Sequence, residues 1–158
     1  MKTTILILSI IVLSFSDFVL AKTIIGKAKV VDGDTIHIQS NKIRLHGIDA
    51  PETKQTCKID NEDWDCGKQS TIELKKLISN KKIECIINDI DRYNRYVAIC
   101  TADEININQW MVRNGWAIAY RYYSKDYILD EKYAQDNELG IWKGEFVEPY
   151  RFRRQNKN

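Results

Sequence analysis

The sequence predicts a mainly β domain with helices (α+β), built as a small closed barrel on which about three helices pack. Five segments have the alternating or β-branched apolar pattern of strands and are separated by turn signals: 23–31, 35–39, 42–45, 82–87 and 96–101. Three other segments have the spacing of helices: 69–79, 109–114 and 127–138.

The first two predicted strands are joined by a short turn. Residues 23–31 are β-branched and apolar, and a bulge or kink is expected at Gly26 because glycine weakens a regular strand. Asp32-Gly33 is a turn signal, after which Ile36 and Ile38 fall on one face of the second strand. This face is predicted to line the core.

The third strand places charged and apolar residues on opposite faces. Ile43 and Leu45 point inward by alternation, so Arg44 faces the other way. The last two predicted strands form a hairpin across residues 91–95.

The three predicted helices have recognisable ends or faces. In the first, Leu74 and Ile78 lie one helical turn apart. Asn108 is the predicted N-cap of the second helix and Gly115 its stop, while Gly140 ends the third.

The start of the chain has the pattern of a secretory signal peptide, residues 1–21, with cleavage after Ala21. The apolar run over 5–15 is too short to span a bilayer, and Ser16-Asp17 interrupts it. We therefore expect an exported protein, periplasmic or secreted, without a stable membrane anchor. Residues 22–158 are enough for one domain with its own core, and we expect it to be a monomer.

The formal net charge is +2, which excludes the overwhelming charge of a histone-like binder. Any contact with nucleic acid must therefore come from local clusters. Residues 142–158 form a basic C-terminal tail containing Arg151, Arg153 and Arg154. Both a solvated terminus and an arm that follows phosphates fit this composition.

Four cysteines in an exported chain indicate two disulfides. Cys57 and Cys66 bracket a polar loop, whereas Cys85 and Cys100 sit symmetrically about the predicted hairpin turn. The expected pairs are therefore Cys57–Cys66 and Cys85–Cys100. A four-thiolate zinc site is a weak alternative because the chain has no Cys-x-x-Cys motif.

Three carboxylates and one arginine lie within residues 34–52: Asp34, Asp49, Glu52 and Arg44. Carboxylates held close together repel one another unless a cation lies between them, and hard oxygen ligands suit Ca²⁺ or Mg²⁺. An arginine beside them can hold a phosphate on two sides. These are the parts of a site that cleaves phosphodiesters.

Ordered motifs carry a resemblance to the staphylococcal nuclease (thermonuclease) family. They are Asp32-Gly33-Asp34-Thr35, Arg44 with Gly47-Ile48-Asp49-Ala50-Pro51-Glu52, Asp91-Arg92-Tyr93-Asn94-Arg95, Gly115-Trp116-Ala117 with Ala119-Tyr120-Arg121-Tyr122, and Leu139-Gly140-Ile141-Trp142. They span most of the mature chain in the order that the family has them. The resemblance implies a five-stranded OB-fold barrel and a Ca²⁺-dependent endonuclease that acts on DNA and RNA and leaves 3′-phosphate ends.

The resemblance also implies a role for individual residues. The calcium ligands would be Asp34, Asp49 and the backbone carbonyl of Ala50. The catalytic residues would be Glu52, which orients or deprotonates the attacking water, with Arg44 and Arg95, which hold the phosphate. The substrate-binding residues would be Arg92, Tyr93, Tyr120 and Tyr122.

Other interpretations remain beside this one. Asp32 is interpreted as a turn former rather than a ligand, and for Tyr120 and Tyr122 a place in the core competes with base stacking. A non-catalytic nucleic-acid-binding barrel would be expected to lack some of these charges, and a cell-envelope binding module could use the same scaffold.

Overall fold

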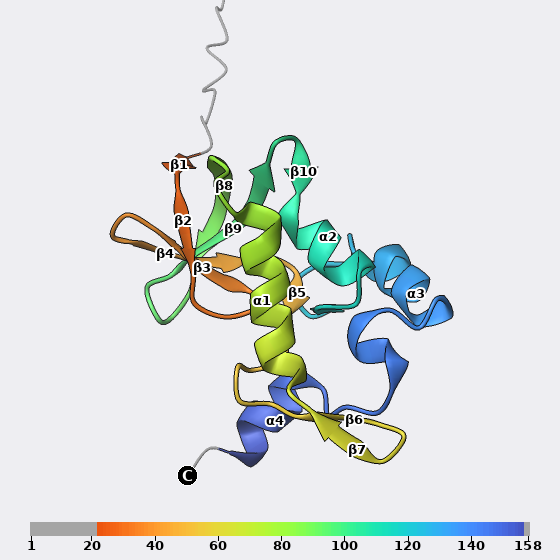
Figure 1. Cartoon of the computed structure of the whole chain (residues 1–158). Helices are drawn as coiled ribbons and strands as arrows, with labels where there is room; N and C mark the ends of the chain where they lie inside the picture. The colour runs from red at the N-terminus through yellow and green to blue at the C-terminus, as the bar shows by residue number, and fades with distance from the viewer. Residues whose placement is uncertain (1–21, 157–158) are drawn as a thin grey trace, which may run out of the picture.

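The computed structural model describes residues 22–156, and Figure 1 shows their arrangement. The predicted signal peptide and its cleavage point lie outside these residues. No helix in the described part of the chain is long and apolar enough to cross a membrane.

One sheet forms the centre of the fold, in the strand order β1-β8-β9-β4-β3-β2. Its strands are β1 (Thr23–Gly26), β2 (Ala28–Val30), β3 (Thr35–Ile38), β4 (Asn41–Leu45), β8 (Ile83–Ile90) and β9 (Tyr96–Ala102). β1 pairs with β8 and β2 pairs with β3, although only Lys27 separates β1 from β2. The two ends of the sheet therefore belong to one chain segment, and the sheet curls into a nearly closed barrel.

This arrangement confirms the predicted five-stranded barrel, with β1 and β2 as the two halves of the first predicted strand. The interruption follows Gly26, where a Cβ atom would lie 2.7 Å from the side chain of Ile38. β4 and β9 pair in parallel, and the other neighbours pair antiparallel. Ile36, Ile38, Ile43 and Leu45 are all buried, as alternation predicts.

The strand count nevertheless exceeds the prediction, because short pairings surround the barrel. They are β5 (Ile48–Asp49) with β11 (Ile118–Ala119), β6 (Cys57–Ile59) with β7 (Glu62–Trp64), and β10 (Ile105–Asn106) at the edge of β9. Strands of two or three residues have too little alternation to be recognised in sequence.

The structure has four α-helices in its described part rather than about three: α1 (Cys66–Ile78), α2 (Ile107–Arg113), α3 (Ile128–Asp136) and α4 (Pro149–Gln155), with a 3₁₀ turn at Gly140–Lys143. α1 runs along the barrel, α2 and α3 lie together, and α4 lies near the β6–β7 hairpin (Figure 1). A backbone bridge between Lys58 and Glu145 joins that hairpin to the segment before α4.

The predicted cap of α2 is wrong by two residues. The side chain of Asn106 accepts a 3.0 Å hydrogen bond from the Gln109 N–H and is the N-cap. Asn108 is buried instead: its amide donates to the carbonyls of His46 (2.9 Å) and Ala98 (3.1 Å). It therefore ties α2 to the barrel, a role that needs tertiary contacts and that local sequence does not reveal.

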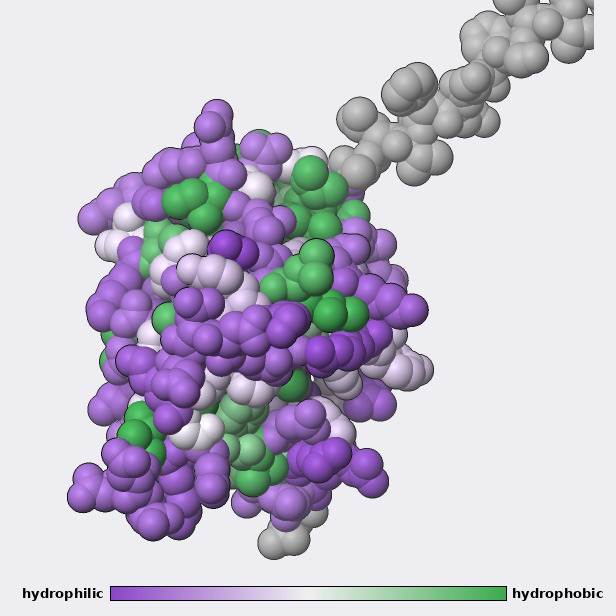
Figure 2. Space-filling model, turned by 90° about the vertical axis from the view of Figure 1, so that its right-hand side faces the viewer, coloured by the Kyte–Doolittle hydropathy of each residue, from purple (hydrophilic) through white to green (hydrophobic). Residues whose placement is uncertain are grey.

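Both predicted disulfides are present. Cys57–Cys66 joins β6 to the start of α1, and Cys85–Cys100 joins directly paired positions of β8 and β9. The surface seen in Figure 2 is mostly hydrophilic, with hydrophobic residues in several separate patches.

Candidate active site

Asp34 and Asp49 reach one location from two parts of the barrel. Asp34 ends the turn between β2 and β3, and its carbonyl accepts a 2.8 Å hydrogen bond from the Leu45 N–H on β4. Asp49 lies in β5, paired with Ile118. Both side chains are buried, at 3% and 0% exposure of the residue. Buried carboxylates need compensating partners, so their surroundings are informative.

Arg44 joins these two aspartates. Its Nη1 forms an ion pair with Asp34, and its Nη2 lies 2.9 Å from Asp49 Oδ1. The same nitrogen donates to the carbonyl of Ile48 at 3.2 Å. Alternation on β4 sends Ile43 and Leu45 into the core and leaves Arg44 to face the acids, as the sequence predicts.

Electrostatics favour the charged form of Asp34. Burial acts to raise its pKa, but the Arg44 guanidinium and the Ala50 N–H, which donates to Oδ2 at 2.9 Å, hold this pKa below its ordinary value. The pKa of Asp49 is shifted in the opposite direction. Burial raises it, and the hydrogen bonds that Asp49 accepts from Arg153 offset only part of this effect.

Asp32 forms the turn before Asp34, in agreement with its interpretation as a turn former. Its Oδ1 accepts a 3.0 Å hydrogen bond from the Asp34 N–H. Burial and the nearby charge of Asp34 raise the pKa of Asp32 to about 7. The turn therefore brings a third carboxyl group to this part of the site.

Glu52 is held through its backbone at the base of α1. Its carbonyl accepts from the Gln55 N–H at 2.7 Å, and its own N–H donates to Gln55 Oε1 at 3.3 Å. Gly67, in the first turn of α1, packs against it so closely that a Cβ atom would lie 1.7 Å from the Glu52 carbonyl oxygen. The side chain of Glu52 keeps 37% exposure, so it is open to solvent while its backbone is fixed.

Arg153 of α4 is the site residue that sequence reasoning missed. Its Nη1 lies 2.9 Å from both Asp49 Oδ1 and Glu52 Oε1, and its Nη2 lies 3.0 Å from Asp49 Oδ2. The sequence leaves a solvated terminus and a phosphate-tracking arm as alternatives for this segment, whereas the structure has a helix against the carboxylates. Glu148-Pro149 signals a helix start, since proline suits the first helical turn, but nothing local indicates where the helix packs.

Arg95 lies near Arg44 in the sheet but has a different partner. It directly precedes β9, on which Val97 is the parallel-strand partner of Arg44. Its guanidinium pairs with Asp91, with Nε and Nη2 at 2.8 and 2.7 Å from Oδ2. Asp91 Oδ1 also accepts hydrogen bonds from the Tyr93 and Arg95 N–H groups, so one carboxylate shapes the hairpin turn and holds the Arg95 guanidinium.

Aromatic rings lie at two places, in the hairpin and in the segment after β11. Tyr93 lies within 4.9 Å of the Arg92 guanidinium carbon and is exposed. Tyr120, Tyr122 and Tyr123 form a cluster with ring centroids 5.0–6.5 Å apart. Tyr122 is 83% exposed, so a core role for it is wrong. Burial and the charge of Asp49 raise the pKa of Tyr120, which relates that ring to the acidic site.

The donor set fits a hard divalent cation. Within residues 22–156 no group of three or more His, Cys, Asp or Glu side chains is arranged as a ready metal cluster. The carboxylates of Asp34, Asp49 and Glu52 are instead bridged by the guanidinium groups of Arg44 and Arg153. These carboxylate oxygens already attract cationic groups, and carboxylate oxygens are the ligands that Ca²⁺ and Mg²⁺ prefer.

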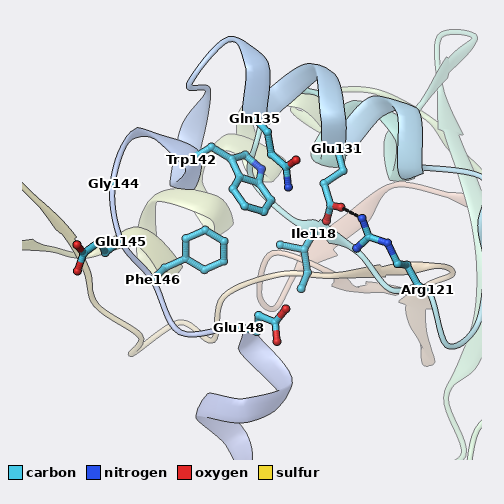
Figure 3. Close-up of a pocket in the computed structure, with 9 residues that line it drawn as sticks. All are labelled: Ile118, Arg121, Glu131, Gln135, Trp142, Gly144, Glu145, Phe146 and Glu148. Carbon is cyan, nitrogen blue, oxygen red and sulfur yellow. Dashed lines mark hydrogen bonds and ion pairs between the residues drawn. The ribbon is translucent and has the colours of Figure 1, made fainter.

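A separate pocket of about 480 Å³ lies between α3, the 3₁₀ turn and the segment before α4 (Figure 3). The ion pair of Arg121 with Glu131 forms one side, and Trp142 with Phe146, whose centroids are 4.9 Å apart, forms another. None of the acidic site residues lines it, so it is distinct from the candidate active site.

Comparison with known proteins identifies the class of this barrel. A family model described as "Staphylococcal nuclease homologue" matches residues 42–144. The chain belongs to the staphylococcal nuclease family, as its motifs predict, and the family's OB-fold agrees with the observed barrel.

Curated relatives of similar length support this membership. The chain is 36% identical over 129 residues to a protein named "Succinoglycan biosynthesis protein ExoI" of Rhizobium meliloti (strain 1021), covering 79% of this chain and 68% of that one. It is 36% identical to an "Uncharacterized endonuclease" of Escherichia coli O157:H7, covering 81% and 83%. It is 32% identical to a "Micrococcal nuclease" of Shigella flexneri, covering 82% and 80%. The printed names of the second and third of these relatives make a nuclease the activity to be tested.

Proposed function

We propose that this protein is an exported, calcium-dependent endonuclease that hydrolyses phosphodiester bonds of DNA and RNA and leaves 3′-phosphate ends. The observation that carries the proposal is the gathering of Asp34, Asp49 and Glu52 around guanidinium groups at one end of the barrel. Membership of the nuclease family and the printed names of two relatives support it.

In the proposed mechanism, buried residues bind the cation and the more exposed Glu52 accepts the proton. Asp34, Asp49 and the Ala50 carbonyl would hold the cation, which supplies positive charge beside a phosphoryl oxygen. Glu52 has a fixed backbone and an exposed carboxylate, so it can accept a proton from the attacking water. The carboxylates of Glu52 and Asp49 share a contact with Arg153 Nη1, at 2.9 Å from each.

The two arginines would act on the phosphate. Arg44 and Arg95 carry guanidinium groups that can stabilise the extra negative charge that develops in the transition state. Arg95 is held at the start of β9 by Asp91, which limits the directions available to its guanidinium. An arginine already held in position loses less conformational freedom when it binds the transition state, so its interaction there is stronger.

The aromatic groups would bind the nucleotides on either side of the phosphate. Tyr120 and Tyr122 offer rings for base stacking, and Arg92 with Tyr93 offers a charge and a ring on the hairpin. Stacking is tolerant of sequence because every base has a π face, which suits an enzyme that cleaves without strong sequence preference.

A plasmid and an RNA transcript, each incubated with the mature protein in Ca²⁺, Mg²⁺ or chelator, test this function. We expect cleavage of both in Ca²⁺ and none in chelator. The cut ends should block extension by a polymerase until a phosphatase removes the 3′-phosphate. Binding to nucleic acid without cleavage under any divalent ion would instead favour a non-catalytic barrel.

A further inference from the structure

The contact between α4 and the acidic site has no part in the proposed reaction. One guanidinium, that of Arg153, engages both oxygens of Asp49 and one oxygen of Glu52, at 2.9–3.0 Å. Paired N–H donors facing a carboxylate form the strongest common type of ion pair in proteins. The contact is therefore specific in geometry and not a passing proximity of surface charges.

This contact uses the oxygens that a divalent cation would need. Asp49 Oδ1 already accepts from Arg44, and Arg153 takes Oδ1 and Oδ2 as well. Asp49 is fully buried, so it has few other directions from which a cation could approach. Arg44 already places one positive charge on Asp49, and Arg153 adds a second, which repels an arriving divalent cation strongly where the surroundings are poor in water.

The way α4 is attached allows it to leave. Among the residues of α4 only Pro149, at its first turn, is buried. The preceding segment is anchored, since the Val147 carbonyl accepts a 2.6 Å hydrogen bond from the buried Gln55 side chain. Beyond Pro149, Tyr150 and Phe152 are only half-buried, so loss of the Arg153 contacts would loosen the helix while the segment before it stays anchored.

We propose that Arg153 is a tethered counter-cation that competes with the divalent metal for Asp49 and Glu52, so that metal binding releases α4 from the site. The inference rests on the proposed function, because it takes these carboxylates as the metal site. In this proposal the competition from Arg153 raises the metal concentration at which the site fills.

Calorimetric titration of the mature protein with CaCl₂ tests the competition without any activity measurement. Arg153→Gln should bind calcium about tenfold more tightly than the wild type, since a competing charge is removed from the ligands. The matched control is Arg154→Gln, which removes the same charge from an exposed neighbour on the same helix and should bind calcium within about twofold of the wild type.

A second measurement follows the helix. Hydrogen–deuterium exchange over residues 149–155 should rise in the wild type when calcium is added, and thermal unfolding in chelator should show that each variant is folded. Equal calcium affinity of Arg153→Gln and the wild type, or unchanged exchange in α4, would overturn the competition alone. Absence of binding of any divalent ion by the wild type and both variants would overturn the proposed function as well.

Discussion

Two arginines contact the same carboxylate, Asp49, from two very different parts of the molecule. Arg44 comes from β4, five residues away, and its side chain is 15% exposed. Arg153 comes from α4, 104 residues away, and its side chain is 33% exposed. The first is built into the barrel, whereas the second belongs to a helix held mainly at its start. Arg44 is therefore a permanent part of the site, whereas Arg153 can be replaced by a metal ion.

The largest expected effect concerns Glu52, which contacts Arg153 but not Arg44 and whose side chain is 37% exposed. Glu52→Gln keeps the shape of the side chain but removes its ability to accept a proton, so the cleavage rate should fall by roughly 10²–10⁴-fold. Initial rates on plasmid DNA in saturating Ca²⁺ measure this. An unchanged melting temperature would show that the variant is folded, and activity within a few fold of the wild type would contradict the role of Glu52.

Removal of each arginine should have unequal consequences for stability. Arg44→Gln leaves Asp34 and Asp49 buried with one charge partner fewer, and breaking a buried pair costs roughly 3–5 kcal/mol of the free energy of unfolding. Arg153→Gln removes a partner whose own side chain is 33% exposed and leaves Asp49 paired with Arg44, so its cost should be smaller than that of Arg44→Gln.

Urea unfolding in the presence of chelator compares the two variants directly. Each midpoint should be read against the wild type under the same conditions, with the slope checked for two-state behaviour. Equal losses from the two substitutions would remove the distinction between a built-in and a replaceable arginine.

Sequence reasoning succeeded where the determinants are local. Alternation identified the barrel strands, and the residues between Asp34 and Glu52 follow one another along a turn, a strand and a bend. It failed where a contact depends on how distant segments pack. Asn108 hydrogen-bonds α2 to the barrel, and Arg153 contacts Asp49 only because α4 packs back against β5. Neither contact has a periodic pattern or a motif that would reveal it.

The smallest expected effect concerns the hairpin that holds Arg95. Burial acts to raise the pKa of Asp91, but hydrogen bonds from Arg95 and Tyr93 hold it below its ordinary value of 3.8. The ionised form is thus favoured in the folded state, so its stabilisation is present above pH 3.8 and is lost as the pH falls through the lowered pKa.

Asp91→Asn should therefore lower the urea midpoint slightly at pH 7, with a difference from the wild type that shrinks in acid. Parallel measurements from pH 7 to pH 3 give the comparison. A loss that stayed constant over this range would show that the charge of Asp91 does not act through the lowered pKa.

Calcium titration by calorimetry of the wild type and Asp49→Asn tests most directly whether the buried carboxylates form the metal site. The account predicts that the wild type binds one calcium ion per chain and that Asp49→Asn, folded by its melting curve, binds it at least about tenfold more weakly, because a charged ligand is lost. Equal affinity in the two proteins would contradict the central claim, since it would place the ion elsewhere.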